Sequence, residues 1–342
     1  MSENELRNTA ATPMITKDLF ESASESSMQD KEKISAPSLS FMADSWRRLK
    51  KNKVAMVSLI ILIIISMSSL LAPVIAPHDP NAQTVQYANM PPKIPGIDIN
   101  GLNGTVKQNG VVIDKYEASN VPEDVYYYLG TDSLGRDLLS RILYGTRVSL
   151  FIAFMAALFN LTLGVVYGLT SGWLGGKVDN IMQRILEILS GVPNLVVVIL
   201  MLLVLKPGIS SIIIALALTE WLSMARVVRA QTLKLKNQEY ILAARTLGQS
   251  PMKIAFRHIL PNLAGVIIIQ VMFSIPSAIF FEAFLSFIGI GIPAPHASLG
   301  PLTTDGYRLF RFFPLLMWCP AGILRVIMIC FNLLADGLRD AF

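Results

Sequence analysis

Few residues of this chain have the types and spacing that catalysis requires. The three histidines, His78, His258 and His296, are scattered, and no segment gathers a serine–histidine or paired-carboxylate set. Cys319 and Cys330 lie in one apolar segment, eleven residues apart. On a helix that separation is about 16 Å, which is too far for a disulfide. The sequence therefore predicts neither an enzyme nor a metal site.

The segment that comes nearest to a nucleotide-binding motif is SGWLGGKV, residues 171–178. A phosphate-binding loop begins with glycine, ends with a serine or threonine that holds Mg²⁺, and follows a strand. Here Ser171 and Val178 occupy those two positions, and the segment ends an apolar helix. We expect that this chain binds no ATP by itself and holds no cofactor.

A polar and basic segment, EYILAARTLGQSPMKIAFRHILPN over 239–262, lies between long apolar runs. Its pattern predicts a helix through Leu247, a stop at Gly248 and a second short helix that begins at Pro251. Two short helices joined by a glycine elbow at a membrane face would form a docking element for a soluble protein. The alternative is an ordinary amphipathic helix that lies in the membrane interface.

The elements that must position this segment belong to a membrane protein. The chain is 53% hydrophobic and only 15% charged, and its mean hydropathy is +0.52. Soluble domains are closer to one quarter charged. A net charge of +5 could indicate nucleic acid, but the basic residues cluster beside apolar runs. Membrane topology explains them better, and we expect no nucleic-acid partner.

The N-terminal third divides into three parts. Residues 1–45 have the composition of a disordered cytoplasmic tail. The basic stretch 46–53 precedes an uncharged span, 54–72, and together 46–76 form an anchor and first transmembrane helix whose basic end stays inside. Residues 77–128 then form an extracytoplasmic loop. Within it, Asn-Gly turns and alternation over 100–116 predict a β-hairpin.

Residues 129–342 contain five further predicted spans. These are 148–171, 188–205 (interrupted early by Pro193), 209–225, 263–288 and 313–334. Turns at 177–184 and 206–208 and a Pro/Gly-rich outer loop over 289–312 connect them. The resulting topology is an all-α polytopic protein with six transmembrane helices and both termini in the cytoplasm.

Two features of the second span concern its structure. Gly164, Gly168, Gly172 and Gly176 recur every four residues, which predicts a smooth ridge for close packing of another helix. Before the span, 129–150 has the pattern of a capped amphipathic helix with Asp132 or Ser133 as its N-cap.

The 239–262 segment resembles the EAA loop of ABC-importer permeases. Ala243, Ala244, Gly248, Leu260 and Pro261 match the loop's spacing, whereas Leu242 and His258 stand where the family has glutamate and isoleucine. The resemblance implies a coupling helix that sits in a groove of an ATPase subunit. The residues that it assigns to ATPase coupling are Glu239, Tyr240, Ala243, Ala244, Gly248, Pro251, Leu260 and Pro261.

Three other blocks, 129–150, 282–292 and 331–342, resemble the oligopeptide/dipeptide/nickel branch of these importers, and specifically its OppC-type second permease subunit. This resemblance implies type I ABC-importer permease architecture in a bacterial cell membrane. It also implies a homologous second permease that shares the translocation path, and two cytoplasmic ATPases that bind ATP and Mg²⁺. An extracytoplasmic peptide-binding protein completes the expected system. The expected cargo is oligopeptides, with dipeptides or nickel as alternatives.

Ionisable residues within spans indicate functional sites by default. Glu282, with Ser286, is assigned to the substrate path, and a helix–helix contact is an equally good interpretation of Glu282. Glu220 lies near a span end, and Arg325 falls within the sixth span without an evident role. The role of the insert at 93–120 is also open: it could contact the binding protein or shield the cavity mouth.

A different class of protein competes with the importer. A secondary transporter driven by an ion gradient often has helices that are broken at the membrane midplane. Pro193 and Pro276 could break helices, but the sequence shows neither an internal repeat nor a chain of intramembrane charges.

Overall fold

The computed structural model describes residues 41–99, 101–108 and 111–342. Most of the predicted tail, 1–45, lies outside the described residues, and its last residues begin helix α2 (Phe41–Leu49). The chain divides into two units, Met1–Asp44 and Ser45–Phe342. The second unit is the membrane part, and the description below concerns that unit by itself.

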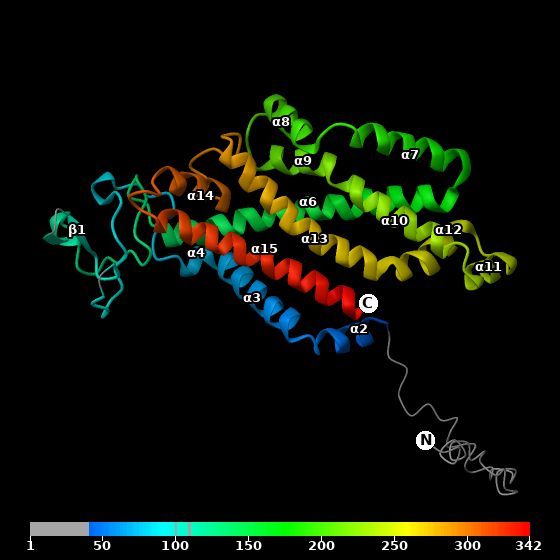
Figure 1. The fold of residues 1–342 in the computed structure, drawn as a ribbon, viewed down its shortest axis with the longest axis horizontal. Coiled ribbons are helices and arrows are strands. Elements are labelled where there is room, and N and C mark those ends of the chain that lie inside the picture. Colours follow the sequence, from blue (N-terminus) through cyan, green and yellow to red (C-terminus); the bar gives the residue numbers. More distant parts are fainter. Residues whose placement is uncertain (1–40, 100, 109–110) are drawn as a thin grey trace, which may run out of the picture. The chain divides into compact units, whose positions relative to one another are not determined.

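Helices make up most of this unit, and four of them are long and apolar (Figure 1). They are α3 (Lys53–Leu70), α6 (Leu138–Leu174), α13 (Leu260–Phe287) and α15 (Leu315–Ala341). The shorter helices are α4 (Ala72–Ile75), η2 (Val85–Tyr87), α5 (Lys115–Ala118), α7 (Gly176–Ser190), α8 (Asn194–Leu205), α9 (Ile209–Thr219), α10 (Trp221–Leu235), α11 (Glu239–Thr246), α12 (Pro251–Ile254), η3 (Ala255–Ile259) and α14 (Leu299–Arg308).

Five helical stretches of the described residues are long and apolar enough to cross a membrane. They are Lys53–Leu70, Leu138–Leu174, Ile209–Leu235, Pro251–Phe287 and Leu315–Ala341. Helices α7 and α8 form a sixth span only if the pair, bent by 76°, is counted as one. Two predictions are therefore corrected. Residues 177–184 belong to α7 and are not a turn, and the break falls between α7 and α8, within the predicted third span 188–205, because the chain stays helical until Gly191 and Pro193 break it.

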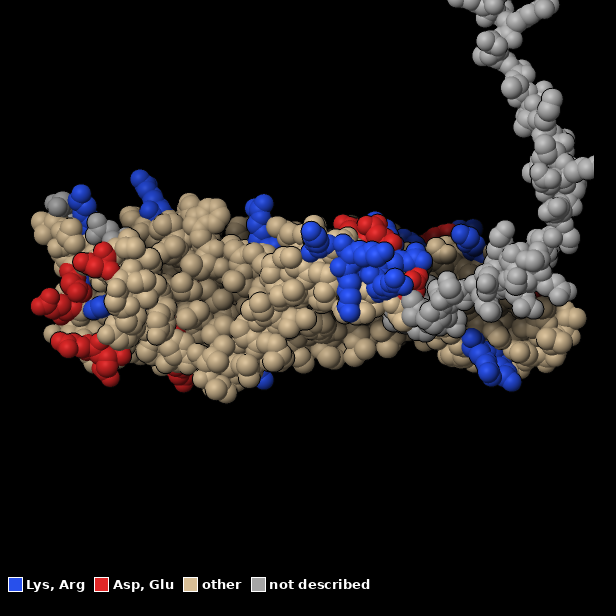
Figure 2. Space-filling view, turned by 90° about the horizontal axis from the view of Figure 1, so that it is seen from below, with Lys and Arg blue, Asp and Glu red and all other residues tan. Residues whose placement is uncertain are grey.

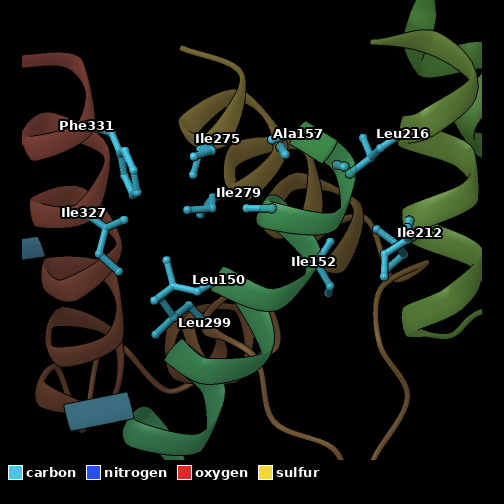
Figure 3. Close-up of a cluster of buried hydrophobic side chains, with 14 of the residues drawn as sticks. Leu150, Ile152, Ala157, Ile212, Leu216, Ile275, Ile279, Leu299, Ile327 and Phe331 are labelled. Carbon is cyan, nitrogen blue, oxygen red and sulfur yellow. The ribbon is translucent and has the colours of Figure 1, made fainter. Parts of the chain in front are cut away.

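Helix α6 occupies the centre of the core. Its side chains Leu150, Ile152 and Ala157 face residues from α9, α13, α14 and α15 in the buried cluster (Figure 3). Because so many helices bury apolar side chains against it, α6 fixes the positions of the others. Its length also extends well beyond the roughly 30 Å of a bilayer core.

The glycine ridge on α6 packs against α10, as the four-residue spacing predicts. A β-carbon on Gly168 would lie 2.4 Å from the carbonyl oxygen of Ala225, and one on Gly172 would lie 2.8 Å from Thr232 Cβ. Gly176 is not part of the ridge, because it begins α7 with a φ of +54° and a β-carbon there would meet nothing within 4 Å. Small side chains therefore set the distance between these two helices.

The N-cap of α6 is Asp137, so the predicted caps Asp132 and Ser133 are wrong. Asp137 Oδ2 accepts a hydrogen bond from the amide of Ser140 at 2.8 Å. Asp132 instead accepts from Arg136 Nε at 2.7 Å, and Arg141 lies 3.6 Å from the same carboxylate. The carboxylate of Asp132 is therefore engaged by arginines and by the turn before the helix, and it does not cap α6.

The insert forms a hairpin where the Asn-Gly pattern predicts one. Strand β1 (Thr105–Gln108) pairs antiparallel with β2 (Val111–Asp114). Tyr116 anchors it: the ring is buried, and the hydroxyl donates to the carbonyl of Pro91 at 3.0 Å. Burial raises the pKa of this hydroxyl well above its usual value. Between the insert and the start of α15 lies a groove of about 540 Å³.

The predicted loop over 289–312 is corrected as well, since it contains α14. The glycine and proline at its start do not prevent a helix there. Pro301 lies in the first turn, where no intrahelical amide is lost. At Gly300 a β-carbon would lie 2.8 Å from Ala283 Cα, so this glycine serves close packing on α13 rather than a turn.

Candidate coupling surface

The 239–262 segment forms the glycine elbow that its pattern predicts. Helix α11 ends at Thr246, and Gly248 has a φ of +77°, a conformation that residues with a β-carbon resist. Ser250 then caps α12: its Oγ accepts from the amide of Lys253 at 3.4 Å. The second helix is not short, contrary to prediction, because α12 continues through the π turn η3 into α13. A displacement at the elbow thus acts directly on a membrane-spanning helix.

One face of this segment packs into the protein. Ile241, Ile254 and Ile259 are buried in a cluster with Met224 and Val228 of α10. Ala244, at 5% exposure, belongs to the same cluster, so its small size serves packing within this chain. We call residues 239–262 the coupling segment, after their predicted role. A small apolar core of its own holds this segment against α10.

Elsewhere along the segment large apolar side chains are exposed, and together we call them the apolar tip. Its members are Tyr240, Leu242, Leu247, Met252 and Phe256. Leu247, next to the elbow, is 80% exposed. Exposed apolar residues that cluster in one place mark interaction surfaces, whereas isolated ones need no explanation. Of these five residues, the resemblance to the family assigns only Tyr240 to ATPase coupling. The other four could have been found in the sequence as large apolar residues within an otherwise polar segment.

The predicted coupling residues divide between the two faces. Glu239, Tyr240, Ala243, Gly248, Pro251 and Pro261 are exposed, Leu260 is half-buried and Ala244 is buried.

An ion pair that the sequence did not reveal fixes the base of this region. Arg229 donates from Nε and Nη2 to the two carboxylate oxygens of Asp179, each at 2.6 Å. Asp179 also accepts from Ser171 Oγ, and Lys236 donates to the carbonyl of Gly172 at 2.8 Å. These contacts join α10 to the ends of α6 and α7. A bidentate pair defines orientation as well as distance.

Two further contacts involve the coupling segment itself. The guanidinium of Arg245 lies 4.7 Å from the ring centroid of Trp173, a cation–π distance. His258 Nε2 lies 3.0 Å from Gln249 Oε1, which links η3 to the elbow. His258, which stands where the family has isoleucine, therefore has a partner within the segment.

Glu282 lies within the protein, near the end of α13 that is farther from the coupling segment. Its side chain is 0% exposed, and its carboxylate accepts from Ser298 at 2.6 Å, Ser149 at 3.1 Å and Ser286 at 3.2 Å. These serines come from α6, α13 and the cap of α14. The geometry thus favours the helix–helix contact as the role of Glu282 and Ser286. Nothing in these contacts supports their assignment to the substrate path.

Glu220 and Arg325 have no such partners. Glu220 is half-buried between α9 and α10, and Arg325 is exposed on α15. Within 41–99, 101–108 and 111–342, neither side chain makes a hydrogen bond or ion pair.

Two family models match the sequence. Residues 164–342 match the binding-protein-dependent transport system inner membrane component, and 40–92 match the N-terminal TM domain of oligopeptide transport permease C. The matched residues include the coupling segment, α13 and α15, and the first helix.

Relatives of known name match over nearly the whole length. The dipeptide transport system permease DppC of Lactococcus lactis subsp. cremoris is 48% identical over 91% of this chain and 92% of its own. The oligopeptide permease OppC of Bacillus subtilis is 41% identical over 96% and 97%. The Escherichia coli K12 OppC is 39% identical over 91% and 93%.

Among solved structures, the inward-facing MetNI methionine ABC transporter has a chain of similar fold. Its TM-score is 0.51 at 17% identity, over 60% of this chain and 98% of that one. This similarity concerns the fold alone. It agrees with the predicted type I permease architecture.

Proposed function

The chain belongs to the family of binding-protein-dependent transport system inner membrane components, and on that premise we propose that it imports short peptides as a permease subunit. Oligopeptides are the proposed cargo, since several similar permeases are named for them and the N-terminal match is to permease C. Dipeptides are the second candidate, favoured by the 48% identity to a dipeptide permease. The chain itself is a transport subunit and not an enzyme.

The observation that carries the mechanism is the apolar tip beside the Gly248 elbow. An exposed apolar surface on a helix pair fits the groove of a soluble protein. We assign that groove to one of two cytoplasmic ATPases, which bind ATP and Mg²⁺. When they close, they move the elbow, and α12, η3 and α13 transmit the displacement because they form one continuous helix.

The distribution of lysines and arginines supports a cytoplasmic position for both termini. A β-carbon on Gly337 would lie 2.3 Å from Ala55 Cβ, and one on Gly265 would lie 3.0 Å from the ring of Phe342. The starts of α3 and α13 and the end of α15 therefore lie together. Exposed lysines and arginines of α2 and the start of α3 form a patch there (Figure 2). The positive-inside rule assigns that end to the cytoplasm.

The opposite end would face the peptide-binding protein. Acidic side chains gather at the insert end, whereas much of the surface between the ends is uncharged in Figure 2. The hairpin and the groove beside α15 offer a contact surface for that protein. Arg325 is exposed on α15, and a charged side chain that faced lipid there would cost free energy. We therefore assign this face of α15 to the contact with the homologous second permease.

The experiment reconstitutes the chain with its second permease, ATPases and binding protein in liposomes and measures peptide uptake. We expect uptake to require ATP hydrolysis. Gly248→Leu should insert normally but lose uptake and ATPase stimulation, because leucine resists a φ of +77°. Gly289→Leu is the matched control: Gly289 has a similar φ of +86° and equally open surroundings, but follows the other end of α13. Uptake that persists with inactive ATPases would instead favour a secondary transporter.

A further inference from the structure

A polar cavity lies beside the break between α7 and α8. Its volume is about 370 Å³, and its polar lining consists of Ser190, Asn194, Thr219, Glu220, Ser223 and Arg226. Ser190 ends α7 and Asn194 begins α8, while Glu220 joins α9 to α10. Three polar helix ends or junctions thus meet at one cavity. Broken helices at mid-membrane commonly form the binding sites of transporters, because their free backbone groups and polar side chains face a hydrated space.

The helical stretch around Glu220 continues to Leu235, beyond the predicted span end at 225, so Glu220 lies in its interior and its lack of a partner is significant. It is the twelfth of the 27 residues of Ile209–Leu235, so it lies about 17 Å along a helix of about 40 Å. Its carboxylate makes no hydrogen bond or ion pair with any described residue. The nearby Arg226 donates to Ser190 Oγ at 2.5 Å instead. A carboxylate at this depth needs water or a counter-charge.

From this geometry we propose that Glu220 binds the terminal ammonium group of the transported peptide while the cargo crosses the membrane. The inference rests on the proposed function as a peptide importer. The hydroxyl and amide oxygens around Glu220 can accept the remaining ammonium hydrogens. Peptides of different sequence share this cationic group, so its recognition suits a path for varied cargo.

The cavity also connects to the helix that receives the coupling movement. Gln270 of α13 donates from Nε2 to Ser223 Oγ at 3.3 Å, in the wall of the cavity. Helix α13 is continuous with the coupling segment. A movement that starts at the ATPases therefore reaches this wall and can release the ammonium group once the path opens inward.

The test measures two rates in the reconstituted complete transporter, peptide uptake and ATP hydrolysis stimulated by the binding protein. In Glu220→Gln we expect the ratio of peptide transported to ATP hydrolysed to fall about tenfold, since a charge-assisted hydrogen bond is lost. ATPase stimulation should remain, because docking and coupling use other surfaces. Glu220→Asp should recover part of the ratio.

Glu187→Gln is the matched control. Glu187 is a carboxylate of α7 that is largely exposed and paired with Arg184 at 2.8 Å. This variant should keep the wild-type ratio. A wild-type transporter that takes up no peptide would refute the proposed function itself.

Two outcomes, both with normal wild-type uptake, would overturn the inference alone. In the first, Glu220→Gln keeps the wild-type ratio. In the second, the variant retains less of the second permease on purification, which would mean that the counter-charge of Glu220 belongs to that subunit.

Chemical restoration of a negative charge at position 220 tests whether the charge of Glu220 or only its shape matters for transport. In a Cys319→Ser, Cys330→Ser background, Glu220→Cys should have a low ratio. Reaction with an anionic methanethiosulfonate should restore it, whereas a cationic reagent should not. Equal results with the two reagents would contradict recognition of a cation.

Discussion

The region around Glu282 and the coupling segment differ in which groups they bury. The first buries a charged group, and the second exposes apolar side chains. Glu282 is fully buried, and three serines from different helices satisfy its carboxylate. At the coupling segment, large apolar side chains such as Leu247 and Met252 face outward without cover. The first region is satisfied within this chain, whereas the second leaves an apolar surface exposed. The Glu220 cavity is also left unsatisfied, since its charge lacks a partner within the described part of the chain.

The largest expected effect concerns the first region. Glu282→Ala removes the acceptor of three buried hydroxyls and leaves a cavity, so we expect a loss of about 3 kcal/mol in stability. The melting temperature and membrane abundance of the purified transporter measure it, and uptake should fall only in proportion to abundance. Normal abundance with lost uptake would break the comparison, because it would return Glu282 to the substrate path.

A somewhat smaller effect is expected at the glycine ridge. Gly168→Ala would place a β-carbon 2.4 Å from the carbonyl oxygen of Ala225, and this overpacking should cost about 2 kcal/mol. The matched control is Gly322→Ala on α15, where a β-carbon meets nothing within 4 Å. That variant should be neutral or slightly stabilising. Equal melting temperatures for the two variants would refute close α6–α10 packing.

At the coupling segment the effect should appear in binding and not in stability. Leu247→Asp should leave the melting temperature unchanged and weaken retention of the ATPase by about 1–2 kcal/mol, roughly tenfold in affinity. Val111→Asp, at an exposed position in the hairpin, is the control and should retain the ATPase fully. A stability loss in Leu247→Asp would show that the apolar tip packs within this chain.

The smallest effect is expected at the base of the coupling region. Arg229→Lys keeps the charge but loses the two-pronged contact with Asp179, so we expect a cost of about 1 kcal/mol in stability. Thermal melting and ATPase stimulation would both decline slightly. An unchanged melting temperature would show that a point charge suffices at this position.

Local patterns predicted much of the fold and the outline of the coupling segment. Apolar runs of bilayer length located the spans, because lipid requires uncharged, helical segments. The elbow at Gly248 and the restart at Pro251 followed from backbone preferences of single residues. These features depend on residues close in sequence, so they could be inferred without tertiary structure.

The sequence-based predictions were incomplete or wrong where a residue's role depends on residues that are distant in sequence. Gly300 suggested a loop, but its small size serves packing of α14 on α13. The apolar residue Leu242 looked like a departure from the family pattern, whereas its exposure places it in the apolar tip. The Asp179–Arg229 pair joins residues fifty positions apart. Contacts of that kind leave no local pattern.

The sequence by itself thus determined a membrane permease with a basic stretch before its first span, a glycine elbow between apolar runs and three charges within or near spans, since composition, periodicity and motif spacing are local properties. Only the tertiary structure decided what surrounds each charge. It buried Glu282 among three serines, left Glu220 in a cavity at a helix break and put Arg325 on an exposed face. The fate of a charge depends on which distant groups surround it, and that depends on how the helices pack.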